Sequence, residues 1–74
     1  MITNSSLAEL TEYLNSNFRG WAIKKYDGYI ITWEEESGGH WISINIEETE
    51  VSSDFPSEHT NEILERLRIR KDLL

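Results

Sequence analysis

Two glycine-containing turn signals divide the middle of the chain into three segments that favour β-strands. Asp27-Gly28 and Gly38-Gly39 are each flanked by runs rich in Ile, Trp, Tyr and Thr. These residue types favour a pleated, half-buried strand, and short glycine-containing connections favour hairpins. Residues 20–46 are therefore predicted to form a three-stranded antiparallel meander.

The alternation of apolar and polar residues indicates a register for the second hairpin. With Gly38-Gly39 as a two-residue loop, residue 36 pairs with residue 41 and residue 33 pairs with residue 44. The residues then directed to the core are Ile31, Trp33, Ile42, Ile44 and Ile46. The opposite face carries Ile30, Thr32, Glu34, Trp41, Ser43 and Asn45. A slip by one residue would mix the two sets, which favours this pairing.

The first hairpin predicts a longer loop by the same test. A two-residue loop at Asp27-Gly28 would direct Lys24 to the core and leave Trp21 and Ile23 outside. A three-residue loop over residues 26–28 brings both apolar side chains into the core and gives the glycine the left-handed position of a G1 bulge. We therefore expect a bulged turn, with Trp21 and Ile23 in the core.

A helix is expected on each side of the meander. Ser6-Leu7-Ala8-Glu9 has the pattern of a capping box, which predicts a first helix over about residues 6–18 that ends before Gly20. A second helix is expected over about residues 57–71, with cationic residues in its last turns. The apolar stripes of the two helices are Leu7, Leu10, Leu14 and Phe18, and Ile63, Leu64, Leu67 and Leu74.

Residues 1–74 are thus predicted to form a single small α+β domain, a two-layer α-β-β-β-α sandwich. Both helices are expected on the face that carries Trp21, Trp33 and Ile44, because the other face is mostly polar. Residues 47–56 lack sustained periodicity and are expected to form an acidic connection. The start of the chain lacks the basic and apolar regions of a signal peptide, and we expect a cytoplasmic protein.

Acidic charge is concentrated in one part of the sequence. The chain has a net charge of −7, and residues 34–58 contain eight acidic residues and no Lys or Arg. Such a surface attracts basic partners and repels nucleic acid and anionic membranes. Direct binding to nucleic acid or to a membrane is therefore not expected.

Patterns of metal sites and catalytic sites are missing from the sequence. There is no cysteine, and His40 and His59 match no zinc motif. The acidic stretch lacks the oxygen-ligand spacing of a calcium loop. Ser52-Ser53-Asp54 and His59 contain the residue types of a hydrolase triad, but they lie in a short polar segment without a nucleophile turn. We expect no enzymatic activity, metal or cofactor.

The leading functional hypothesis is a small inhibitor or immunity protein that occupies a basic, nucleic-acid-binding surface of a target protein, as mobile elements such as phages encode. The residues assigned to this contact are Glu34, Glu36, Glu47, Glu48, Glu50 and Asp54. The alternative is a homodimer or assembly subunit that associates through its open sheet face or sheet edge, with Trp41 and Ile30 at the centre. A third interpretation is that the acidic stretch serves only solubility.

Overall fold

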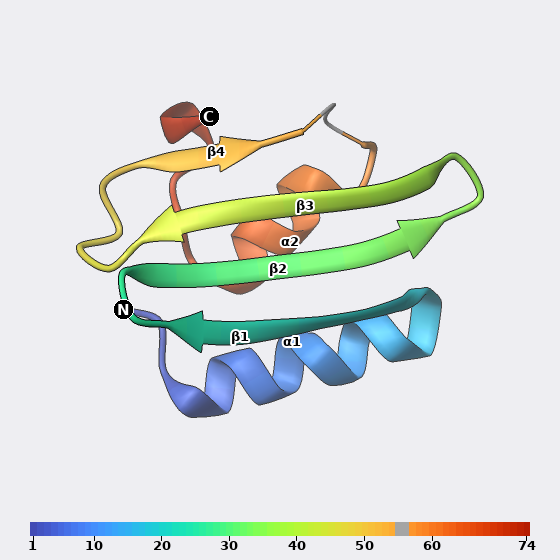
Figure 1. Ribbon diagram of the computed structural model, residues 1–74, viewed down its shortest axis with the longest axis horizontal. Coiled ribbons are helices and arrows are strands. Elements are labelled where there is room, and N and C mark those ends of the chain that lie inside the picture. The colour runs from blue at the N-terminus through green and yellow to red at the C-terminus, as the bar shows by residue number, and fades with distance from the viewer. Residues whose placement is uncertain (55–56) are drawn as a thin grey trace.

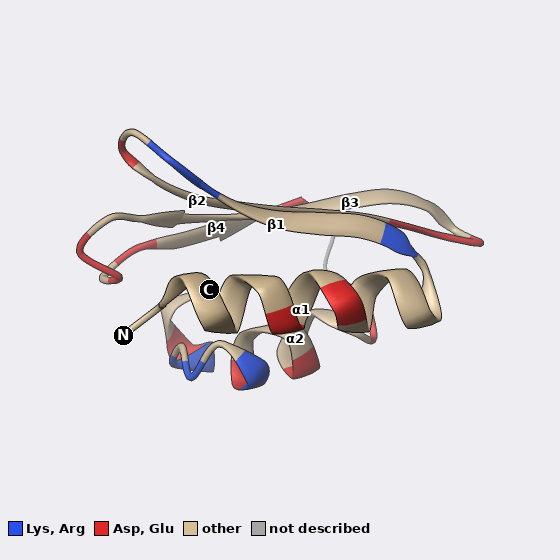
Figure 2. Cartoon of the chain, turned by 90° about the horizontal axis from the view of Figure 1, so that it is seen from below, with Lys and Arg blue, Asp and Glu red and all other residues tan. Residues whose placement is uncertain are grey.

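The computed structural model describes residues 1–54 and 57–74 and has two layers, a four-stranded antiparallel sheet and a layer of helices (Figure 1). The strands lie in the order β1-β2-β3-β4 and span Arg19–Lys25, Gly28–Glu35, Gly38–Asn45 and Val51–Ser53. The helices are α1 (Asn4–Asn17), α2 (Thr60–Arg66) and a short 3-10 helix, η1 (Lys71–Leu73). Figure 2 shows both α1 and α2 on the same side of the sheet. The predicted two-layer α+β fold is confirmed, with a fourth strand added.

The core lies between the sheet and the two helices. Most of the residues assigned to it from the sequence are buried: Leu7, Leu10, Leu14, Ile31, Trp33, Ile42, Ile44, Ile63, Leu64 and Leu67. Phe18 is partly buried against this cluster. Ile46 and Leu74 are exposed, contrary to prediction. Each lies just beyond the end of its element, since β3 ends at Asn45 and η1 ends at Leu73.

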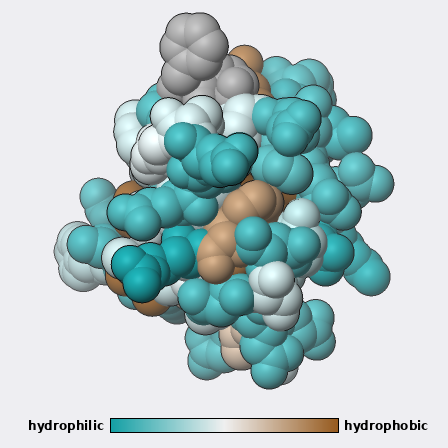
Figure 3. Space-filling view, turned by 90° about the vertical axis from the view of Figure 1, so that its right-hand side faces the viewer, coloured by the Kyte–Doolittle hydropathy of each residue, from teal (hydrophilic) through white to brown (hydrophobic). Residues whose placement is uncertain are grey.

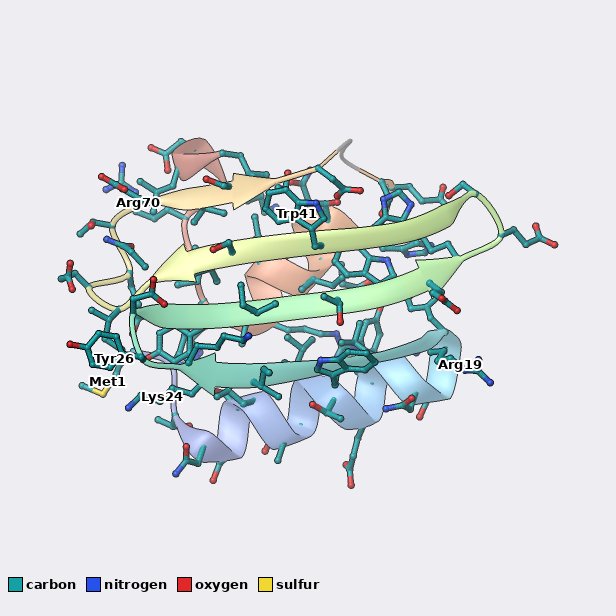
Figure 4. The ribbon with its side chains drawn as sticks, viewed as in Figure 1. Met1, Arg19, Lys24, Tyr26, Trp41 and Arg70 are labelled. Carbon is teal, nitrogen blue, oxygen red and sulfur yellow. The ribbon has the colours of Figure 1, made fainter. Side chains whose placement is uncertain are left out.

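The predicted register of the first hairpin is wrong. Lys25 pairs with Gly28, so the loop is Tyr26-Asp27 and no bulge shifts the pairing. Trp21 and Ile23 therefore point away from the helices and are 51% and 41% exposed. Lys24 takes a core-side position only at the end of β1, where its side chain remains exposed to water (Figure 4). The Lys24 ammonium group therefore keeps its hydration, and this orientation of β1 carries no free-energy cost for burying a charge.

Small residues on the core side of β1 explain this register. Gly20 pairs with Trp33, and a Cβ at Gly20 would lie 2.7 Å from the Trp33 Cβ, far too close for a side chain. Ala22 is the next core-side residue of β1 and is buried. With only a hydrogen atom and a methyl group on this side, the β1 backbone leaves room for the Trp33 indole and for a close approach of α1.

Two polar side chains of α1 bind the outer edge of β1. The Asn15 amide donates to the Gly20 carbonyl at 2.7 Å and accepts from the Gly20 N–H at 3.4 Å. The Thr11 hydroxyl accepts from the Ala22 N–H at 3.0 Å and donates to the Ala22 carbonyl at 3.4 Å. These bonds replace those that a further strand would make, so α1 covers most of an edge that would otherwise be open to pairing.

The second hairpin keeps the predicted faces but not the predicted pairs. Glu35 pairs with Gly38 and Ile31 with Ile42, so the loop is Glu36-Ser37. This register differs from the predicted one by four residues, an even number, which preserves the division into faces. Gly38 has a φ of 123°, a conformation that side chains disfavour, and this conformation at the start of β3 fixes the loop before it.

The connection after β3 is more ordered than its sequence suggested. The Asn45 side-chain carbonyl accepts from the N–H groups of Thr49 and Glu50, at 2.8 and 2.7 Å, and so turns the chain back on itself. Residues 51–53 then pair with β3 as the strand β4, where a loop was predicted. Phe55 and Pro56, the last part of the predicted connection, lie outside the described residues.

The helix ends also differ from prediction. Thr3, not Ser6, is the N-cap of α1, and Ser6 completes the capping box in place of Glu9, so the helix begins two residues early. The second helix is shorter than expected and is followed by Arg68, which has a φ of 59° and breaks the helical path. The chain then continues into η1, with Ile69 buried in the core.

Removing the side chains that bind the β1 edge should destabilise the fold. We expect the Thr11→Val, Asn15→Ala double variant to lose about 2 kcal/mol of unfolding free energy, because two backbone N–H groups and two carbonyls lose their partners. Urea denaturation followed by circular dichroism measures this loss. Ser16→Ala is the matched control, since the Ser16 hydroxyl donates to the Glu12 carbonyl of the same helix and to no other described residue. An equal effect of the two changes would show that the edge contacts are unimportant.

Candidate functional site

The acidic residues of the 34–58 stretch lie at opposite ends of the sheet (Figure 2). Glu34 and Glu36 are exposed at the β2–β3 hairpin, and Glu47 and Glu50 are exposed in the connection between β3 and β4. The eight residues of β3 separate these ends by about 26 Å, at about 3.3 Å per residue. This separation exceeds the Debye length of about 8 Å in physiological salt, so the two groups act as separate charges.

Two of the assigned acidic residues bind within the protein. The Glu48 carboxylate accepts from the Ile2 N–H at 3.0 Å, and its side chain is only 17% exposed. The Asp54 carboxylate accepts from the Trp41 N–H at 3.1 Å and contacts His40 Nδ1 at 3.1 Å. Both residues therefore stabilise the fold. The other four assigned acids, Glu34, Glu36, Glu47 and Glu50, are exposed, and their carboxylates make no hydrogen bond or ion pair with the described residues.

A cleft of about 820 Å³ lies at the β2–β3 hairpin end, between the hairpin and the segment that leads into α2. Its lining includes Phe18, Glu35, His40, Glu58 and His59. Figure 3 looks onto this end of the molecule and shows a mostly hydrophilic surface around a smaller hydrophobic area. The described residues contain no group of three potential metal ligands, here or elsewhere.

Glu35 anchors one wall of this cleft. Its carboxylate accepts from the Trp33 indole N–H at 2.6 Å and lies 3.9 Å from His59 Nε2. Burial of the carboxyl group favours its neutral form, but the hydrogen bonds from Trp33 and Ser57 and the charges of the nearby histidines outweigh this effect. The pKa of Glu35 is therefore lowered below its ordinary value, and the ionised side chain stabilises the junction of hairpin and α2.

A Ser-His-Asp chain of contacts runs along the same end of the sheet. The Ser37 Oγ lies 3.1 Å from His40 Nε2, and His40 Nδ1 lies 3.1 Å from the Asp54 Oδ2. The sequence singled out Ser52, Ser53, Asp54 and His59. The structure instead brings Ser37 and His40 together with Asp54. Their spacing gave no signal, because it depends on the unexpected loop at residues 36–37.

The surroundings of the Ser37-His40-Asp54 contacts favour a structural role for these residues. The His40 ring stacks on Trp33 with the ring centroids 5.5 Å apart, and Asp54 also accepts from the Trp41 N–H. Glu34 and Glu36 line the neighbouring cleft, where their negative charge would oppose an oxyanion of acyl transfer. Asp54 thus fastens the end of β4 to β3 through His40 and the Trp41 N–H, and Ser37 adds only an exposed contact to His40.

The open face of the sheet carries a row of exposed aromatic residues. Trp21 on β1, Thr32 on β2 and Trp41 on β3 are directly opposite one another in the register. The two indoles are 51% and 41% exposed, and Figure 4 shows Trp41 on the face turned away from the helices. In the next row, Ile23 pairs with Ile30. We call these four apolar residues, Trp21, Ile23, Ile30 and Trp41, the open apolar face.

A groove of about 310 Å³ lies at the aromatic row of this face. Trp21, Thr32 and Trp41 line it, and Arg19 and Glu34 line its end toward the β2–β3 hairpin. The buried Thr32 hydroxyl has no hydrogen-bond partner among the described residues. The lining is thus mainly aromatic, with one cation and one anion at one end.

Trp41 and Ile30 occupy the open face predicted for them, whereas Trp21 and Ile23 were placed in the core. The alternation of Gly20 and Ala22 with these two residues is the sequence signal that indicates the correct side. The size of Trp21 and Ile23 favours the opposite side, because large apolar residues of a strand usually face its core.

Comparison with known protein families, characterised proteins and solved structures gives no match for this chain. Among the described residues, no helix has both the length and the apolar character needed to cross a membrane. The surface features that bear on function are the open apolar face and the acidic ends of the sheet.

The ionised Glu35 side chain predicts a pH-dependent effect of Glu35→Gln. Because the folded-state pKa is lowered, the contribution is present at neutral pH and is lost as the pH falls through that pKa, below the ordinary value of about 4.3. We expect the variant to be less stable than wild type by about 1 kcal/mol at pH 7, with the difference disappearing in acid. Urea denaturation at several pH values measures it. Glu36→Gln, at an exposed neighbour, should show little difference at any pH.

Asp54→Ala tests the structural role of the Ser-His-Asp chain. We expect a loss of about 1–3 kcal/mol of unfolding free energy, because His40 and the Trp41 N–H lose their charged acceptor. Ser37→Ala should change the unfolding free energy by less than about 0.5 kcal/mol, since Ser37 is exposed. Thermal and urea denaturation report both values. A Ser37 substitution as costly as that of Asp54 would contradict this assignment.

Proposed function

We propose that this chain is a non-enzymatic module that binds a partner protein through the open apolar face. The observation that carries the proposal is the exposed row of Trp21 and Trp41, with Ile23 and Ile30 beside it, on the sheet face opposite α1 and α2. Tryptophan is among the residues most enriched at the energetic centres of protein interfaces, and contiguous exposed apolar patches mark such interfaces.

The edges of the sheet support a contact through its face. Thr11 and Asn15 bind the outer backbone of β1, and β4 has only three residues. Pairing with a strand of another protein therefore has little free backbone to use. The open apolar face offers a larger surface than the edges, and burying its apolar side chains against a partner costs little desolvation free energy.

Charge determines what kind of partner fits. The exposed carboxylates of Glu34 and Glu36 lie at one end of the face, and Glu47 and Glu50 lie toward the other. A partner with an apolar centre and cations around it would match this arrangement, and it would associate faster as the ionic strength falls. The partner would thus have the basic character expected from the sequence, and the centre of contact would lie at the tryptophans instead of the acidic stretch.

Substitution of the two exposed tryptophans should abolish partner capture and leave the fold intact. Tagged wild type, a Trp21→Thr, Trp41→Thr double variant and Tyr26→Ala are compared in nuclease-treated lysate of the source organism, with captured proteins quantified by mass spectrometry. Threonine keeps the strand propensity of these positions. Tyr26 is the matched control, because it is a fully exposed aromatic residue at a turn.

The expected result is a partner that wild type and Tyr26→Ala retain in equal amount and that the double variant loses at least tenfold. Circular dichroism confirms that each variant is folded. Capture that survives the double variant, and is lost instead with Glu34→Lys and Glu36→Lys, would overturn the assignment of the face and favour the acidic hairpin end as the contact.

A further inference from the structure

We infer that the groove between Trp21 and Trp41 binds a proline-rich segment in the polyproline II conformation, with a cationic residue beside it. This inference rests on the proposed function and names the chemistry of the partner. It follows from four features of the described residues: the spacing of the indoles, their N–H donors, the covered or short sheet edges, and the charge beside the groove.

The spacing of the two tryptophans matches the repeat of a polyproline II helix. Trp21 and Trp41 are on strands separated by β2, so their backbones are about 9.5 Å apart. A polyproline II helix has three residues per turn and rises about 3.1 Å per residue, so one turn advances about 9.3 Å. A peptide that crosses the strands would thus place residues i and i+3 against the two indoles, as in a Pro-x-x-Pro sequence.

The hydrogen-bonding character of the groove suits the same ligand. Polyproline II has no internal hydrogen bonds, so its carbonyls require donors. Neither the Trp21 nor the Trp41 indole N–H donates a hydrogen bond within the parts of the chain that the structure describes. Both are available to donate to peptide carbonyls while their ring faces contact proline rings. Exposed aromatic residues in a groove bind such segments because proline-rich chains lose little conformational entropy on binding.

Other ways of binding a peptide fit the molecule less well. Addition of a strand needs a free edge, whereas the backbone groups of Gly20 and Ala22 on the β1 edge are bonded to α1 and β4 is short. A second copy of the chain would bring together two molecules of net charge −7, which opposes association. A ligand without regular structure would lose more entropy on ordering.

Charge at the hairpin end selects the residues that flank the prolines. Glu34 lines the groove and Glu36 is exposed in the adjacent turn, while Arg19 is the cation at this end. Two carboxylates against one guanidinium leave a negative potential along the hairpin side of the groove, beside a peptide that crosses the strands. An arginine or lysine next to the Pro-x-x-Pro unit would lie in this potential, whereas an acidic residue would be repelled.

Isothermal titration of the full chain with synthetic peptides tests the inference. The probe is Arg-Arg-Pro-Pro-Ala-Pro-Pro-Ala-Pro, and the comparison peptides replace either its prolines by alanine and glycine or its arginines by glutamate. We expect binding of the probe, weakening of at least about tenfold by Trp21→Thr or Trp41→Thr, and no change with Tyr26→Ala. Glu36→Gln should weaken binding about twofold, and more at low ionic strength.

Each contrary outcome identifies what is wrong. Equal binding of the proline-free peptide, or binding unaffected by either tryptophan substitution, would overturn the inferred ligand. Absence of peptide binding together with tryptophan-dependent capture of a partner from lysate would overturn the ligand and leave the proposed function in place. Loss of both would overturn both. A wild-type dimer in sedimentation equilibrium that Trp41→Thr abolishes would replace the peptide by a second copy.

Discussion

The close approach of α1 to β1 is the constraint on which the rest of the structure depends. It requires a strand with almost no side-chain volume on its inner side, and Gly20 and Ala22 supply this surface. Thr11 and Asn15 then reach the backbone of β1 and bind its outer edge. One arrangement therefore packs the helix, makes room for the Trp33 indole and covers most of the β1 edge of the sheet against pairing with another chain.

The same constraint determines what the molecule presents to solvent. Because alternate residues of a strand point to opposite faces, small residues on the inner side of β1 send Trp21 and Ile23 outward. The register of β3 places Trp41 in line with Trp21. The open apolar face is thus a direct result of how the core is packed on the other side of the sheet.

Much of the architecture could be predicted from the sequence, because it depends on periodicity. The positions of α1 and of the strands β1 to β3, and the face of Ile31, Trp33, Ile42 and Ile44, follow from apolar alternation and turn signals. The pairing of the strands could not be predicted in this way. In the second hairpin an even shift of register leaves the faces unchanged, so alternation alone cannot distinguish the possible loops.

The errors at the candidate site have a related physical cause. The side of Trp21 depends on the volume available beneath β1, which becomes apparent only when α1 is placed against it. The contacts of His40 with Ser37 and Asp54 depend on the true loop and on β4, a strand of three residues that is too short for a periodic signal. The acidic residues are close together along the chain, but the length of β3 separates them in space.

The distribution of the three tryptophans gives the molecule intrinsic optical reporters for separate events. Trp33 is 2% exposed and lies against His40 and Glu35, so its emission should respond to unfolding and to protonation of the Glu35 carboxylate that its indole N–H contacts. Trp21 and Trp41 are accessible from solvent and should be quenched first by iodide or acrylamide. Fluorescence of the unlabelled chain can therefore distinguish loss of the core from occupation of the open apolar face.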